Sequence, residues 1–101
     1  IEGTRIFKRE HFEEKVKYQE YRQEHYGQPY SLVQLDIRDT PLSLIELELI
    51  LRQSMREIDL IGFDENNGQL QFLLPGTPQE YANRFLERIK TVYIQKGGRV
   101  Q

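Results

Sequence analysis

Two apolar runs joined by an Asn-Gly turn constrain the fold of this chain more than any other feature. The runs cover residues 60–63 and 69–74, and the turn between them reads Asp64-Glu65-Asn66-Asn67-Gly68. Asn-Gly between two apolar runs is the strongest short-range signal of a β-hairpin, because both residues tolerate the positive φ of a type I′ turn. We therefore expect two antiparallel strands joined by a type I′ turn at Asn67 and Gly68.

A helix is predicted directly after the hairpin. Pro75 and Gly76 end the second strand, and residues 77–80 read Thr-Pro-Gln-Glu, which matches a capping box with Pro at the first helical position. Apolar residues then recur at helical spacing up to a Gly-Gly pair at residues 97 and 98. The residues that carry this pattern are Ala82, Phe85, Leu86, Ile89, Val92 and Tyr93.

A helix and a strand are predicted near the start of the chain. Residues 9–26 are rich in Glu, Lys, Gln and Arg, which are good helix formers, and Gly27 and Pro29 end the segment. Residues 30–37 are nearly continuously apolar, as is typical of a central strand that is covered on both faces.

A second helix is predicted before the hairpin. Thr40 is expected to cap it, Pro41 to open it, and it is expected to run to about residue 58. A stripe at spacings of three and four residues consists of Leu44, Leu47, Leu51, Met55 and Ile58. Ile45 and Leu49 widen this stripe beyond one contact face, which indicates either deep burial or a surface for a partner.

The order of these elements predicts an α+β fold in a single domain that covers residues 1–101. A βαββα core, with one more strand expected to begin at residues 99–101, closes as an antiparallel sheet with helices packed on one face. This is the ferredoxin-like arrangement, here preceded by an N-terminal helix.

Composition excludes several classes of function. The 101 residues contain no Cys, so a thiolate nucleophile and a Cys-type zinc site are ruled out, and a net charge of −2 disfavours binding to nucleic acid. Apolar runs fall far short of the roughly 20 residues of a membrane span, so we expect no membrane contact by this segment. Because the chain starts at Ile1 and not at Met, we expect it to be a fragment of a longer protein.

The chain resembles the GGDEF family, the diguanylate cyclase fold, in four pieces that follow one another in the family's order. FKREHFEEKV is similar to the family's opening helix, and GQPYSLVQLDI is similar to its first strand. REIDLIGF is similar to the segment that leads into the signature hairpin, and LQFLLPGTPQEYANRFLERI is similar to the segment that follows it. The resemblance covers nearly the whole chain and implies the same α+β fold.

The residues that the family uses for catalysis are missing at the corresponding positions. The signature hairpin of active members falls on Asn66, Asn67, Gly68, Gln69 and Leu70, so Gly68 and Gln69 replace its acidic pair. A glycine has no side-chain ligand, and an amide is a poor substitute for a carboxylate at Mg²⁺. Asp36 matches the first metal carboxylate of the family, but the nucleotide-gripping segment after it is absent. We expect no cyclase activity, no metal and no cofactor.

A second feature of the family is matched by Arg56-Glu57-Ile58-Asp59. The resemblance implies an allosteric Arg-x-x-Asp site for cyclic di-GMP at this junction of helix and strand. A guanidinium fork can pair with a guanine edge or a phosphate, and a carboxylate can accept guanine N–H groups. We expect Arg56 and Asp59 to form the site, completed by Arg52, by Arg38 or by an arginine of a second copy. The alternative is a solvated helix end.

Two functions remain open. In the first, the domain is a regulatory cyclic di-GMP receptor within a bacterial signalling protein, and the resemblance implies exopolysaccharide assembly as the process. In the second, it has lost the ligand and works as a dimerisation or protein-interaction domain through its second helix. The resemblance implies a cytoplasmic domain, with a parent protein that can be membrane-anchored.

Overall fold

The computed structural model describes residues 3–98, in which strands alternate with helices except at the hairpin, where two strands follow one another. In chain order the elements are β1 (Phe7–Lys8), α1 (Arg9–Tyr26), β2 (Tyr30–Asp36), α2 (Leu44–Arg52), β3 (Leu60–Asp64), β4 (Gln69–Pro75) and α3 (Gln79–Gln95). The predicted α+β class is confirmed. The strand that we expected at residues 99–101 lies outside the described residues.

The sheet is mixed and not purely antiparallel, which corrects the prediction. Its strand order is β1-β3-β4-β2, and β4 pairs antiparallel with both of its neighbours. β1 pairs with β3 in the parallel sense, through Phe7 with Gly62 and Lys8 with Phe63. A strand of two residues is too short to show an alternating pattern, so the sequence carried no signal for it.

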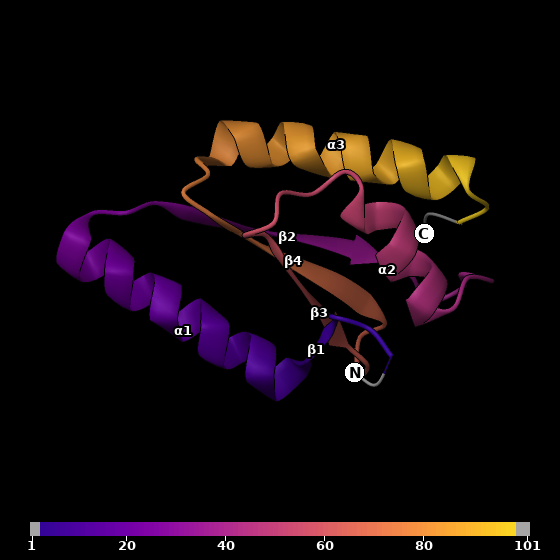
Figure 1. Ribbon diagram of the computed structural model, residues 1–101, viewed down its shortest axis with the longest axis horizontal. Coiled ribbons are helices and arrows are strands. Elements are labelled where there is room, and N and C mark those ends of the chain that lie inside the picture. The colour runs from indigo at the N-terminus through magenta and orange to yellow at the C-terminus, as the bar shows by residue number, and fades with distance from the viewer. Residues whose placement is uncertain (1–2, 99–101) are drawn as a thin grey trace.

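Helices cover both faces of the sheet, whereas we had expected them on one face. Figure 1 shows α1 on one side of the sheet and α3 on the other, with α2 beside α3. On the α3 side, the rings of Phe72 and Phe85 meet edge to face at 5.5 Å. The buried core on this side consists of Ile6, Val33, Leu35, Ile37, Leu47, Leu51, Ile61, Leu70, Phe72, Leu74, Ala82, Phe85, Ile89 and Tyr93.

On the opposite face of the sheet, α1 makes a close contact with β3. Phe12 of α1 is only 2% exposed, and its ring lies directly on Gly62 of β3. A Cβ atom at residue 62 would lie 2.5 Å from Cγ of Phe12, which is closer than real side chains approach. A glycine in the middle of β3 therefore lets α1 lie close against the sheet.

The hairpin forms where we predicted it, but its turn is of another kind. Asp64 pairs with Gln69, which leaves residues 65–68 as a four-residue loop. Gly68 has a φ of 62°, whereas Asn67 is not among the positive-φ residues, so a type I′ turn is ruled out. Asp64 holds the loop instead, because its carboxylate accepts hydrogen bonds from the backbone N–H of Asn66 and Asn67 and from Asn67 Nδ2. This side-chain mimic of a backbone turn accounts for the difference.

α2 is shorter than predicted and has a different cap. Ser43 Oγ accepts from the backbone N–H of Glu46 at 3.2 Å, and Glu46 Oε1 accepts from the backbone N–H of Ser43 at 3.3 Å. This capping box starts the helix after Ser43, while the Thr40 hydroxyl accepts from the N–H of Leu42 in the preceding loop. The helix ends at Arg52, and Ile58 at the far end of the predicted stripe is 57% exposed.

α3 starts without the predicted capping box. Pro78 is its N-cap residue and supplies no side-chain hydrogen bond. The Thr77 hydroxyl is engaged elsewhere, because it accepts a hydrogen bond from Arg56 Nη2. The apolar stripe of the helix is buried as expected at Ala82, Phe85, Ile89 and Tyr93.

Candidate functional site

Arg56 and Asp59 form an ion pair in the connection between α2 and β3. Asp59 is 2% exposed, and its carboxylate accepts hydrogen bonds from Arg56 Nη2 at 2.7 Å and from Arg56 Nε at 3.1 Å. It also accepts from the backbone N–H of Arg56 at 2.9 Å. A buried carboxylate needs such partners to offset its lost hydration, so the pair holds the Arg56 guanidinium in one orientation.

Arg56 also reaches the start of α3. Its Nη2 donates to the carbonyl oxygen of Pro75 at 2.9 Å and to the Thr77 hydroxyl at 2.8 Å. The guanidinium thus joins the connection before β3 to the connection after β4. About half of the Arg56 side chain, 51%, stays exposed.

A hollow of about 400 Å³ lies beside this pair, and α3 supplies its other charged residues. Arg84 and Arg88 line it together with Arg56, and among residues 3–98 Asp59 is the one acid in its lining. Tyr81 lines it as well, with Arg84 Cζ 5.5 Å from the centre of its ring. Arg88 Nη2 donates to the carbonyl oxygen of Ser54, which ties α3 to the end of α2. Three guanidinium groups against one paired carboxylate make the hollow positive, although the whole chain carries a net charge of −2.

Sequence reasoning missed Tyr81, Arg84 and Arg88. On the sequence they are ordinary polar positions of an amphipathic helix, and nothing there distinguishes them from the other charged residues of α3. Their spacing of three and four residues places them on one side of the helix. Only the fold shows that this side lies next to Arg56.

Arg52 and Arg38, which we expected to complete the site, do not line this hollow. Arg52 is mostly buried and donates from Nε to Glu48 Oε2 at 3.2 Å and from Nη1 to the carbonyl oxygen of Asp59 at 3.0 Å. It therefore supports the backbone of Asp59 from outside the hollow, and its contact with a ligand stays a prediction. Arg38 lies at the hairpin, where it pairs with Asp36.

The loop of the hairpin borders a second cleft of about 590 Å³. Asn66, Asn67 and Gly68 line it, whereas Gln69 starts β4 and Leu70 is fully buried. Arg38 Nη2 lies 2.7 Å from Asp36 Oδ2, and this hydrogen-bonded pairing lowers the pKa of Asp36. Gly68 leaves room for Arg38, because a Cβ atom there would collide with Arg38 Cγ. Within residues 3–98, no three His, Cys, Asp or Glu side chains gather in a way that could hold a metal ion.

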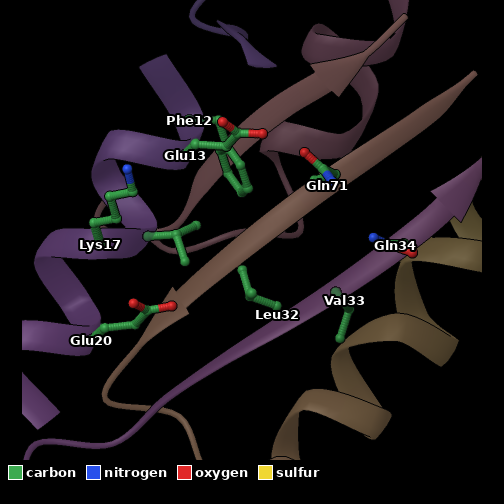
Figure 2. A pocket seen from close by; sticks show the side chains of 9 residues that line it. Phe12, Glu13, Lys17, Glu20, Leu32, Val33, Gln34 and Gln71 are labelled. Atoms are coloured by element: carbon green, nitrogen blue, oxygen red, sulfur yellow. The ribbon is translucent and has the colours of Figure 1, made fainter. Parts of the chain in front are cut away.

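A third hollow, of about 290 Å³, lies between α1 and the sheet (Figure 2). Phe12 and Leu32 contribute apolar surface, and Glu13, Lys17 and Glu20 of α1 stand along its side. Gln71 of β4 has a buried Oε1 that accepts no hydrogen bond from the described part of the chain. This hollow lies on the opposite side of the sheet from α3, so it is separate from the Arg56 site.

No helix among residues 3–98 is long and apolar enough to cross a membrane.

Comparison with known structures identifies the fold as diguanylate cyclase-like, that is, GGDEF-like. The diguanylate cyclase SiaD of Pseudomonas aeruginosa, solved in complex with its activator SiaC, has a TM-score of 0.69 and 27% sequence identity. That match covers 84% of this chain but only 37% of the length of SiaD. A DGC protein from Thermotoga maritima has a TM-score of 0.73 and 25% identity over 94% of this chain and 76% of its own. No family model and no curated protein sequence matches the chain.

Proposed function

We propose that this chain is a non-catalytic, GGDEF-like receptor domain that binds cyclic di-GMP at the hollow beside Arg56. The observation that carries the proposal is the convergence of Arg56, Arg84 and Arg88 on one hollow. Arginine forks suit phosphates and guanine edges, because their paired N–H groups match two acceptors at once.

Asp59 has a positioning role in this proposal. With 2% exposure and its oxygens already bonded to Arg56, it orients the guanidinium instead of meeting the ligand directly. The exposed half of Arg56 is the part that a ligand contacts.

The degenerate hairpin supports a role without catalysis. Gly68 and Gln69 stand at the positions of the acidic pair, and the remaining carboxylate, Asp36, is paired with Arg38. Phosphoryl transfer of this kind relies on metal ions that bridge and neutralise phosphate oxygens. A lone carboxylate whose charge an arginine already balances is a poor start for such a site.

Calorimetric titration with cyclic di-GMP tests the proposal, with GTP and Mg²⁺ as a parallel titration. We expect the dinucleotide to bind and GTP to give no signal. Arg56→Ala should abolish binding. Arg84→Ala should weaken binding without loss of fold, because the Arg84 side chain makes no hydrogen bond or ion pair within residues 3–98 and contacts the exposed ring of Tyr81. Arg22→Ala on α1 is the matched control, since Arg22 also contacts a tyrosine, Tyr18, but lies far from the hollow in the fold. Absence of dinucleotide binding to the wild-type chain would refute the proposal.

The second candidate function is docking of another protein chain on α2. Ile45 and Leu49 lie one turn apart and are 51% and 65% exposed, although both are large and apolar. SiaD was solved with a protein activator, so one protein of this fold has a protein partner. In either case we propose a cytoplasmic domain of a longer bacterial signalling protein. For the receptor function, exopolysaccharide assembly is the expected process.

A further inference from the structure

Tyr81 is an exposed aromatic residue at the edge of the positively charged hollow beside Arg56. It lies in the first turns of α3, is 52% exposed and lines the hollow that contains Arg56 and Arg88. Its ring is held on one side by Arg84, whose Cζ lies 5.5 Å from the ring centre. A cation over an aromatic face is attracted by the electrons of the ring, so Arg84 limits the orientations that Tyr81 can adopt.

We propose that Tyr81 is the platform on which a planar base of the ligand stacks. This inference rests on the proposed function and goes beyond it, because it names a residue that selects among anionic ligands. Arginines alone attract any phosphate, whereas a ring held at the edge of the hollow favours a ligand that carries both phosphate and a flat heterocycle. The site is then specific for nucleotides over inorganic phosphates.

Two substitutions of Tyr81 distinguish a role in stacking on the ligand from a role in packing within the protein. Stacking needs the ring and not the hydroxyl, so phenylalanine should serve as well as tyrosine and alanine should not. Position 81 lies on the surface of a helix, where alanine is a good helix former, so Tyr81→Ala should fold normally.

The experiment is a set of calorimetric titrations of the chain with cyclic di-GMP and with pyrophosphate, a phosphate probe without a base. We expect Tyr81→Ala to bind the dinucleotide about tenfold or more weakly than wild type, and Tyr81→Phe to bind as wild type does. Affinity for pyrophosphate should be the same in all three proteins. Tyr18→Ala is the matched control, because Tyr18 on α1 is 57% exposed and also has an arginine, Arg22, over its ring at 5.7 Å.

The outcomes distinguish this inference from the function on which it rests. Loss of affinity in Tyr81→Ala, with Tyr81→Phe and Tyr18→Ala unchanged, supports the stacking platform. Wild-type affinity in Tyr81→Ala, while Arg56→Ala no longer binds, overturns the platform and leaves the receptor function standing. Absence of binding by the wild-type chain overturns the receptor function, and the platform with it.

Discussion

The carboxylate of Asp59 has almost no contact with water and takes hydrogen bonds from both the backbone and the side chain of Arg56. Removing the arginine leaves a buried charge without its main partner, which destabilises a protein more than the pair itself stabilises it. Because half of the Arg56 side chain is in water, solvent can compensate for part of this loss. Arg84→Ala is therefore the cleaner probe of binding, since within residues 3–98 Arg84 pairs with no buried carboxylate and contacts the exposed ring of Tyr81.

Asp64 gives a prediction about pH. Hydrogen bonding from the Asn67 side chain lowers the pKa of this carboxyl below its ordinary value of about 3.9. A lowered pKa in the folded state means that Asp64 stabilises the fold at any pH above its unfolded pKa. That contribution is lost as the pH falls below about 4 and through the folded pKa.

We expect Asp64→Asn to lower the thermal midpoint at about pH 7, and this effect to shrink as the pH is lowered through about 4 and the wild-type carboxyl becomes protonated and so resembles the amide. Thermal melts of both proteins across this range measure the difference. If the difference between the two thermal midpoints stays constant with pH, the stabilising role of the ionised Asp64 carboxylate is wrong.

Among the elements, α1 depends on the contact between Phe12 and Gly62 for its place on the sheet. Gly62→Ala should lower the free energy of unfolding by about 1–3 kcal/mol, because the added methyl group overlaps the ring. In a Phe12→Ala background the same change should cost much less, since the ring is gone. Urea denaturation of the four proteins measures this coupling, and additive effects would show that the contact does not position α1.

Elements with a strong periodic signal could be predicted from the sequence, and elements shaped by local side-chain bonds could not. α1 occupies the predicted residues 9–26, because a polar helix ended by Gly27 has no competing pattern. The predicted second helix was too long at both ends, since apolar spacing continued through Met55 and Ile58 where the chain forms turns. Ser43 and Thr40 are both good cap residues, but only Ser43 has a glutamate three residues later, so the sequence already favoured Ser43 and the apolar stripe obscured that signal.

Within the candidate site, Arg56 and Asp59 could be found from the sequence because they lie three residues apart in one connection. Tyr81, Arg84 and Arg88 belong to another element, more than twenty residues further on. They reach the hollow only because β3 and β4 return the chain to the same end of the sheet. The sequence therefore predicted the Arg56–Asp59 pair, whereas the residues that α3 adds to the hollow could be identified only from the fold.

At the scale of the whole molecule, α2 carries two exposed apolar side chains, Ile45 and Leu49. If Ile45 and Leu49 dock a second copy, the wild-type chain should show a concentration-dependent increase in mass by sedimentation. Leu49→Glu should abolish that increase, because a charge at an apolar interface is costly to desolvate. Cyclic di-GMP affinity should not change, since Leu49 does not line the Arg56 hollow. A wild-type chain that stays monomeric at all concentrations would remove dimerisation through α2 as a function.

β4 occupies the centre of the sheet and joins β2 on one side to β3 on the other. It is also the last of the described strands to be synthesised, and β2 precedes it by more than thirty residues. A nascent chain that ends before Gln69 consequently has a complete α1 and an apolar β2, but not β4, the strand with which β2 pairs. Assembly of the sheet has to wait for the hairpin, so we expect the domain to fold late in its own synthesis, with the apolar β2 exposed to aggregation until then.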